Sequence, residues 1–243
     1  MIFPKINLHA HTLYSDGSNS IKHMVKTALE IKLNYLAITD HLSDSLKADL
    51  IPTLNSAVKI QEYLNEINQC DIFLRKNNVD LKLYKGIEID LGSSSNFIKN
   101  LVLPQNFDII LFEYLETPEG IAFISEIIKY WKKKVTNQSD FPILGLAHFD
   151  LSHFIYGDFS ILIEFLKDYN IYFEFNTSYS EYYSRKYEMF FELIKKKNIP
   201  VAVGSDAHSS KELGYIEEAY EVIKIYDLES NFKLLLDSLN DKY

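Results

Sequence analysis

The stretch Asn7-Leu8-His9-Ala10-His11-Thr12-Leu13-Tyr14-Ser15-Asp16-Gly17 contains two histidines separated by one residue and, five residues further on, an aspartate. A short apolar run, Ile2-Phe3 and Ile6, comes before it and predicts a first strand. Side chains alternate between faces along a strand, so His9 and His11 point the same way. Two imidazoles on one face at a strand end can bind one divalent metal ion, and Asp16 follows within a short loop.

The alternative is that both are surface histidines, because His-x-His also occurs by chance. Metal binding is favoured because the same residue types recur near the other end of the chain, in Gly204-Ser205-Asp206-Ala207-His208. A pair of such motifs at strand ends predicts one shared site.

Apolar runs of strand length alternate with helical patterns along the rest of the chain. Further strands are expected at residues 35–39, 81–90, 107–112, 142–147, 171–176 and 199–204. Helices are expected at residues 20–31, 56–76, 118–134, 158–168, 185–197, 215–226 and 229–239. Residues 43–55 are expected to form a loop, and residues 92–96 a flexible turn. Strands separated by helices favour parallel pairing with right-handed crossovers, and therefore an α/β fold.

Polar residues stand where the apolar strands stop: His9, His11, His41, Glu88, His148, Asp206 and His208. In a β/α barrel the carboxyl ends of the strands converge on one face, where such enzymes keep their sites. This placement favours one closed or nearly closed barrel of about seven strands, a single domain over residues 1–243, rather than an open sheet. A Gly-rich dinucleotide loop is absent from the sequence, so a nicotinamide or flavin site is not expected.

The composition argues against several classes of protein. The chain has 243 residues and a formal net charge of −9, which argues against non-specific nucleic-acid binding. The single cysteine, Cys70, excludes a disulfide framework or a cysteine-rich zinc module. Neither a secretory signal nor an apolar run long enough to span a membrane is found, so no membrane partner and a cytoplasmic setting are expected.

The candidate ligands are imidazoles and carboxylates without a thiolate. This mixture suits Zn, Mn or Fe ions rather than a structural zinc. Clustered histidines with a bridging carboxylate are typical of metal-assisted hydrolysis, in which paired ions activate water and neutralise a phosphoryl group. A site for several divalent metal ions is therefore predicted.

The order of these motifs resembles that of the PHP (polymerase and histidinol phosphatase) family over nearly the whole chain. The matching motifs are His9-x-His11 with Ser15-Asp16-Gly17, Thr39-Asp40-His41, the strand-end Glu88, Ala147-His148 and Gly204-Ser205-Asp206-Ala207-His208. The resemblance implies a distorted seven-stranded β/α barrel and a site for two or three divalent metal ions.

The resemblance also implies a role for each motif. One ion is expected to be held by His9, His11, Glu88 and Asp206. A second is expected at Glu88 and His148, with Glu88 as the bridge, and a third at Asp16, His41 and His208. Asp40, which we place among the catalytic residues, and Asp150 are expected to orient histidines rather than to bind a metal ion directly.

Two positions depart from the family pattern. The family commonly has a histidine after the aspartate of the fourth strand, and here Leu115 stands in its place. Glu113 or Glu116 could substitute as an oxygen ligand; alternatively both are surface acids and the second metal position is weak or lost. After His148, the family's histidinol phosphatases tend to have an arginine where His153 stands here. Arg185 could supply a guanidinium group from a neighbouring loop, or it could be a solvated helix start.

The activity implied is hydrolysis of a phosphate ester by metal-activated water, with His153 or a metal-coordinated water molecule protonating the leaving alkoxide. A small anionic phosphomonoester is expected as substrate, with L-histidinol phosphate, an intermediate of histidine biosynthesis, as the leading candidate. This choice of substrate rests on the resemblance alone. A phosphodiesterase or 5′-to-3′ exonuclease of the same family, and a non-catalytic barrel subunit of the RNase P type, remain the alternatives.

Overall fold

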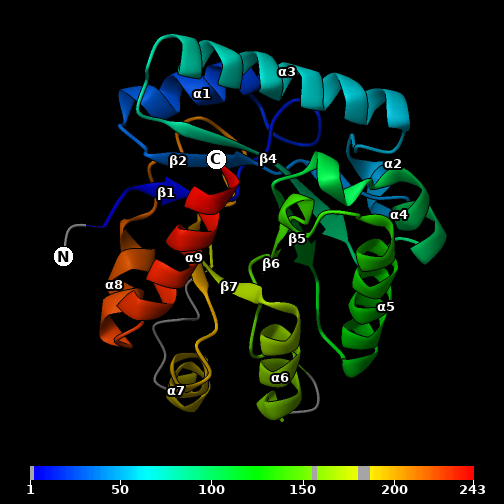
Figure 1. Cartoon of the computed structure of the whole chain (residues 1–243), viewed down its shortest axis with the longest axis vertical. Coiled ribbons are helices and arrows are strands. Elements are labelled where there is room, and N and C mark those ends of the chain that lie inside the picture. The colour runs from blue at the N-terminus through cyan, green and yellow to red at the C-terminus, as the bar shows by residue number, and fades with distance from the viewer. Residues whose placement is uncertain (1–2, 155–157, 180–186) are drawn as a thin grey trace.

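The computed structural model describes residues 3–154, 158–179 and 187–243 (Figure 1). Among these residues, seven parallel strands follow one another in one sheet: β1 (Ile6–Asn7), β2 (Tyr35–Ile38), β4 (Lys82–Asp90), β5 (Ile109–Glu113), β6 (Ile143–Leu146), β7 (Ile171–Asn176) and β8 (Val201–Gly204). A short eighth strand, β3 (His41–Leu42), lies off this path and pairs with β4. The predicted α/β class and the parallel pairing are confirmed.

The first and last strands come together and nearly close the sheet into a barrel. The N–H of Leu8, just after β1, donates to the carbonyl of Val203 in β8 at 3.0 Å. One step further along, Ala10 forms a parallel bridge with Ala207. Because Ala10 also accepts from the N–H of Thr39 at 2.8 Å, the segment that carries His9 and His11 is held between two neighbouring strands.

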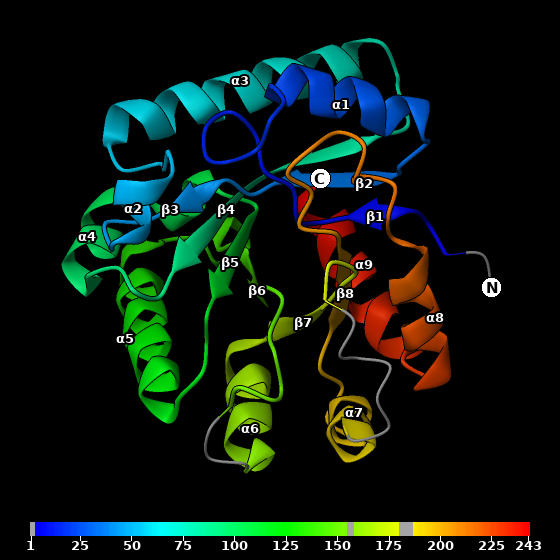
Figure 2. The same ribbon diagram turned by 180° about the vertical axis from the view of Figure 1, so that it is seen from behind.

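Helices surround the sheet: α1 (Ile21–Glu30), α3 (Ala57–Lys76), α5 (Pro118–Lys134), α6 (Phe159–Tyr169), α7 (Glu188–Lys196), α8 (Glu217–Ile225) and α9 (Glu229–Lys242). Helices α1 and α3 run side by side over β2 and β4, as both views show (Figures 1 and 2). The helix starts follow the sequence closely, since Ser20, Ser56 and Thr117 each cap the backbone three residues later. Pro118 occupies the first turn of α5, where its missing N–H costs nothing.

Two short helices correct the sequence predictions. The expected loop at residues 43–55 contains α2 (Lys47–Leu50), and the expected turn at 92–96 leads into α4 (Ser95–Leu101). Helix α2 has no buried residue and α4 buries Ile98 alone, so neither shows a periodic apolar face. Two 3₁₀ turns, at Pro104–Asn106 and Gln138–Asp140, were likewise not predicted. Residue 2 of the expected first strand and residues 185–186 of an expected helix lie outside the described residues.

One continuous apolar core fills the barrel and the space beneath the helices. Its largest fully buried side chains include Trp131 on α5, Tyr63 on α3 and Phe173 on β7. Cys70 on α3 is a free thiol that packs against this core. None of the helices in the described part of the chain is long and apolar enough to cross a membrane.

Candidate metal centre

Strand β1 and the residues after it deliver two imidazoles to the mouth of the barrel. His9 and His11 are both fully buried, and their Nε2 atoms lie 3.0 Å apart. The predicted common orientation of the two side chains is therefore found in the structure. Asp206, two residues after β8, joins them, with its Oδ1 2.9 Å from His11 Nε2 and 3.3 Å from His9 Nε2.

Glu88, near the end of β4, lies in the middle of the cluster. Its Oε1 is 3.2 Å from Nε2 of His9 and 3.3 Å from Nε2 of His148. Its Oε2 is 2.8 Å from Nδ1 of His41 and 3.4 Å from Nε2 of His11. A carboxylate with imidazoles against both of its oxygens has the position of a bridging ligand.

A second group lies beside the first, around Asp16. Its Oδ1 is 3.6 Å from Nε2 of His41, and its Oδ2 is 3.2 Å from Nε2 of His208. The His11 ring stacks on the rings of both His41 and His208, with centroids 4.3 and 4.5 Å away. His11 therefore lies between the two groups.

The β5 side of the centre carries a carboxylate and a lysine. Glu113, the last residue of β5, is fully buried, with Oε1 3.4 Å from Nδ1 of His41 and Oε2 4.0 Å from Nε2 of His148. Of the two acids that the sequence left open, Glu113 thus belongs to the centre, whereas Glu116 is exposed. The interpretation of Glu113 as a surface acid is wrong. Nζ of Lys47, from α2, contacts both oxygens of Glu113 at 2.7 and 2.8 Å.

The donor set suits divalent metal ions. Within each of four overlapping groups, one ligand atom per residue lies within 4.8 Å of the others: His11/Asp16/His41/His208, His9/His11/Asp206, His9/Glu88/His148 and His41/Glu88/Glu113. Among the described residues, four buried carboxylate oxygens have no hydrogen-bond partner: Asp16 Oδ1, Glu88 Oε1, Glu88 Oε2 and Asp206 Oδ1. Imidazole nitrogens nevertheless crowd them. Ligands of one metal ion direct their lone pairs toward the ion and do not hydrogen-bond to each other. The unpaired carboxylate oxygens beside the imidazole nitrogens fit this arrangement.

Burial and neighbouring charges shift the pKa values of these side chains in opposite directions. Burial lowers the pKa of His41, but the negative charges of Glu88 and its neighbours outweigh it and raise that pKa to about 12. The carboxylate of Asp16 raises the pKa of His208 to about 9, against the effect of burial. For Asp206, burial raises the pKa, yet the adjacent imidazoles hold it below its usual range. Protons and metal ions therefore compete for the same lone pairs.

Glu174, on β7, is a site residue that sequence reasoning missed. It is fully buried, and its carboxylate lies 3.0 and 3.1 Å from Nδ1 of His9. It also accepts from the N–H of His148 at 2.7 Å and from Nδ2 of Asn176 at 3.1 Å. Because the Glu174 carboxylate contacts Nδ1 of His9, the other ring nitrogen, Nε2, faces the remaining ligands. The available signal was an acidic residue in the middle of an otherwise apolar strand.

Asp40 lies behind the cluster and belongs to none of the four groups. It accepts hydrogen bonds from the N–H and hydroxyl of Thr12, both at 2.7 Å, and from the hydroxyl of Ser15 at 2.6 Å. Ser15 Oγ in turn lies 3.4 Å from Nδ1 of His11. Asp40 therefore fixes the loop between His11 and Asp16 and reaches His11 through Ser15. Its assignment as a catalytic residue stays a prediction.

His153 lines a cavity that His148 also lines. Its side chain is 67% exposed, and its Nδ1 lies 3.3 Å from Oδ2 of Asp150. Asp150, expected to orient a histidine, thus pairs with His153. Both line a cavity of about 210 Å³ that also reaches His148, Tyr114 and Tyr179. Arg185 lies outside the described residues, so its predicted role stays a prediction.

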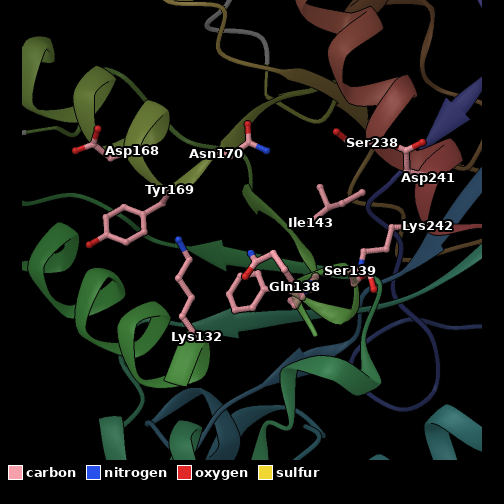
Figure 3. Close-up of a pocket in the computed structure, with 12 residues that line it drawn as sticks. Lys132, Gln138, Ser139, Ile143, Asp168, Tyr169, Asn170, Ser238, Asp241 and Lys242 are labelled. Carbon is pink, nitrogen blue, oxygen red and sulfur yellow. The ribbon is translucent and has the colours of Figure 1, made fainter. Parts of the chain in front are cut away.

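A second cavity, of about 430 Å³, lies away from this chemistry. It opens between the ends of α5, α6 and α9, beside the first residues of β6 and β7 (Figure 3). Lys132, Asp168, Asp241 and Lys242 are among its lining residues, and none of these belongs to the four groups. Because the cavity lies beside the first residues of β6 and β7, it is at the amino ends of the strands, opposite the rim where His9 and Asp206 lie.

The fold and the site define an α/β barrel with a cluster of imidazoles and carboxylates at the carboxyl ends of its strands. A family model described as "PHP domain" matches residues 7–242. The chain therefore belongs to the PHP family, and the resemblance drawn from the motifs is confirmed. A comparison with curated proteins gives no match.

Solved structures of similar fold are found among histidinol phosphatases. A "putative histidinol phosphatase" from Listeria monocytogenes has a TM-score of 0.62 and 17% sequence identity, covering 89% of this chain and 100% of its own. Histidinol phosphate phosphatase from Lactococcus lactis, complexed with zinc, L-histidinol and phosphate, has a TM-score of 0.57 and 17% identity. That match covers 91% of this chain and 93% of the other. At this identity the two structures establish the shared fold.

Proposed function

We propose that this protein is a metal-dependent phosphatase that hydrolyses a small phosphomonoester, with L-histidinol phosphate as the leading substrate. The observation that carries the proposal is the buried group of imidazoles and carboxylates at the rim of the barrel, with ligand atoms within 4.8 Å of one another. Membership of the PHP family and the chemistry named for the Lactococcus lactis structure support it.

We assign the residues of the centre to three candidate positions for an ion. The first ion would be held by His9, His11 and Asp206 together with the adjacent Glu88, and the third by Asp16, His41 and His208. Glu88 and His148 border the second position. Divalent ions bound there would offset the negative charge of the phosphoryl group and would lower the pKa of a bound water molecule. Zinc, manganese and iron all suit this set of ligands.

The other residues of the site would position the metal ligands and protonate the leaving group. Glu174 holds His9 with Nε2 toward the ligands, and Asp40 anchors the loop that carries Asp16. His153, paired with Asp150, is exposed at the mouth of the centre and is the candidate donor of a proton to the leaving alkoxide. Arg185 remains the candidate guanidinium for binding the phosphoryl oxygens.

The cavity beside His148 favours a cationic, ring-bearing leaving group. Tyr179 stacks on the His148 ring with centroids 4.9 Å apart, and Tyr114 meets the same ring edge-on. Glu116 and Asp150 place carboxylates on the cavity wall. An aromatic and acidic wall is complementary to an amino alcohol that carries an imidazole ring, which is the chemistry of histidinol.

The proposal is tested with protein loaded with Mn²⁺ and, separately, with Zn²⁺. Phosphate release from L-histidinol phosphate is measured beside cleavage of bis(4-nitrophenyl) phosphate. We expect fast monoester hydrolysis that a chelator abolishes. Diester cleavage without monoester turnover would contradict the phosphatase assignment and favour the phosphodiesterase alternative.

A matched pair of variants assigns the activity to the centre. His9→Ala should abolish turnover because it removes a ligand of the first ion. His23→Ala, at an exposed position on α1, should retain the wild-type rate. An unchanged rate in metal-replete His9→Ala would refute the site assignment.

A further inference from the structure

Lys47 places a positive charge inside the centre, where the sequence predicted only a loop. Its Nζ lies 2.7 and 2.8 Å from the two oxygens of Glu113, and 3.2 Å from Nδ1 of His41. The lysine side chain is 19% exposed, and Glu113 is fully buried. The ammonium group contacts both oxygens of a buried carboxylate, so this is a buried ion pair and not a surface contact.

This ammonium group contacts two of the three members of one candidate metal site. Glu113 and His41 form that site together with Glu88. An ammonium nitrogen has three donors and no lone pair, so Lys47 cannot coordinate a metal ion. Its charge repels a divalent ion, and its hydrogen bonds engage the Glu113 oxygens that an ion would need.

Leu115 removes a further ligand from the same side of the centre. Its side chain is buried and apolar at the position where the family pattern has a histidine. The second position is then bordered by Glu88 and His148, and Glu88 also serves the first position. His9, Glu88 and His148 form one of the four groups, but His9 and Glu88 both serve the first position as well, so His148 is the one ligand of this group that the second position does not share. Zinc sites in proteins use three or four protein ligands, so the second position is short of ligands of its own.

We propose that the ammonium group of Lys47 takes the place of a metal ion beside Glu113, so that the centre holds two divalent ions and one fixed lysine. This inference rests on the proposed metal centre and specifies how many ions it holds. The two ions occupy the first and third positions. Lys47 supplies the remaining positive charge on the β5 side, next to the cavity that Tyr114 and His148 line.

The test is the number of tightly bound ions per chain, measured by elemental analysis after Mn²⁺ or Zn²⁺ loading and gel filtration. Wild-type protein should hold two. Lys47→Met keeps most of the side-chain volume and removes the charge, which frees Glu113, so this variant should hold three. Lys47→Met combined with Glu113→Gln should return to two. Lys26→Met, at an exposed position on α1, is the matched control and should hold two.

Circular dichroism establishes that each variant is folded before its ions are counted. Three ions in the wild type, or two in folded Lys47→Met, would overturn the role of Lys47 and leave the metal centre standing. A wild-type protein that retains no ion would instead refute the proposed function. The two failures are therefore distinguishable by the same measurement.

Discussion

Three residues of the site leave their strands through unusual backbone angles. Tyr114, His148 and Asp206 follow β5, β6 and β8, and their φ angles are +60°, +30° and +50°. Non-glycine residues in this region cost about 1–3 kcal/mol each and persist where the surroundings fix them. The N–H of His148 donates to buried Glu174, which is one such restraint. The turn at His148 places its imidazole against Glu88 and not along the strand.

Glu174 supports the His9 ligand from behind, so its replacement should weaken ion binding. Its Oε2 accepts from His148 and Asn176, while Oε1 faces Nδ1 of His9. In Glu174→Gln an amide NH₂ must replace one of these oxygens and so oppose a donor. We expect ion affinity at the first position to fall about 10- to 100-fold, as for other groups that support a ligating histidine. Competition with a chromogenic chelator measures this affinity.

The control for Glu174→Gln is Glu164→Gln, an exposed glutamate on α6 that pairs with Lys197. It should bind ions as the wild type does. If Glu174→Gln also kept the wild-type affinity, Glu174 would have only a packing role.

Residues at strand ends were predictable from the sequence, whereas their partners were not. Each of the eight candidate ligands lies in one of the four groups. Seven of them could be located because an apolar run marks where a strand stops, and Asp16 because it follows the His9-x-His11 motif within a short loop. Lys47 and Glu174 could not be identified as site residues from the sequence, because tertiary contacts bring them to the centre. Lys47 reaches the centre from a helix of one turn, and Glu174 looks like a polar interruption of an apolar strand.

At the scale of elements, the approach of β7 to β8 depends on a missing side chain. A Cβ on Gly204 would lie 1.9 Å from Oε1 of Glu174 and 2.8 Å from Cβ of His9. We expect Gly204→Ala to lower the free energy of unfolding by about 1–3 kcal/mol, because overpacking forces the neighbouring backbone to shift. The midpoint of urea unfolding measures the change.

Gly214→Ala is the matched control for that substitution. The nearest atom to its added Cβ is Cδ1 of Ile31 at 3.7 Å, an ordinary contact. Its free energy of unfolding should stay within about 0.5 kcal/mol of the wild type. Equal destabilisation by the two substitutions would show that the close contact at Gly204 is not the cause.

Elements with a long apolar pattern were predicted well. Helix α5 begins and ends where expected, at Pro118 and Lys134, and β7 spans the expected residues 171–176. The short elements α2, α4 and β3 were missed because each has too few buried positions to show a period. Such elements are stabilised by contacts with the rest of the barrel rather than by their own sequence.

At the scale of the whole molecule, barrel closure assembles the centre. His9 and Asp206 come from opposite ends of the chain and meet because the segment after β1 pairs with β8. The sequence indicated a barrel through the placement of its polar residues, but pairing of the first and last strands is a long-range contact that no local pattern encodes. Lys47 offsets part of the negative charge of the carboxylates that the barrel gathers at this rim, and bound divalent ions would offset the rest.

The central claim is that this rim is a metal centre, and anomalous X-ray scattering from crystals grown with Mn²⁺ or Zn²⁺ tests it most directly. We predict one peak among His9, His11, Glu88 and Asp206, and another among Asp16, His41 and His208. Density beside Glu113 should be the ammonium group of Lys47, without an anomalous signal. The absence of any anomalous peak among these histidines and carboxylates would contradict the account.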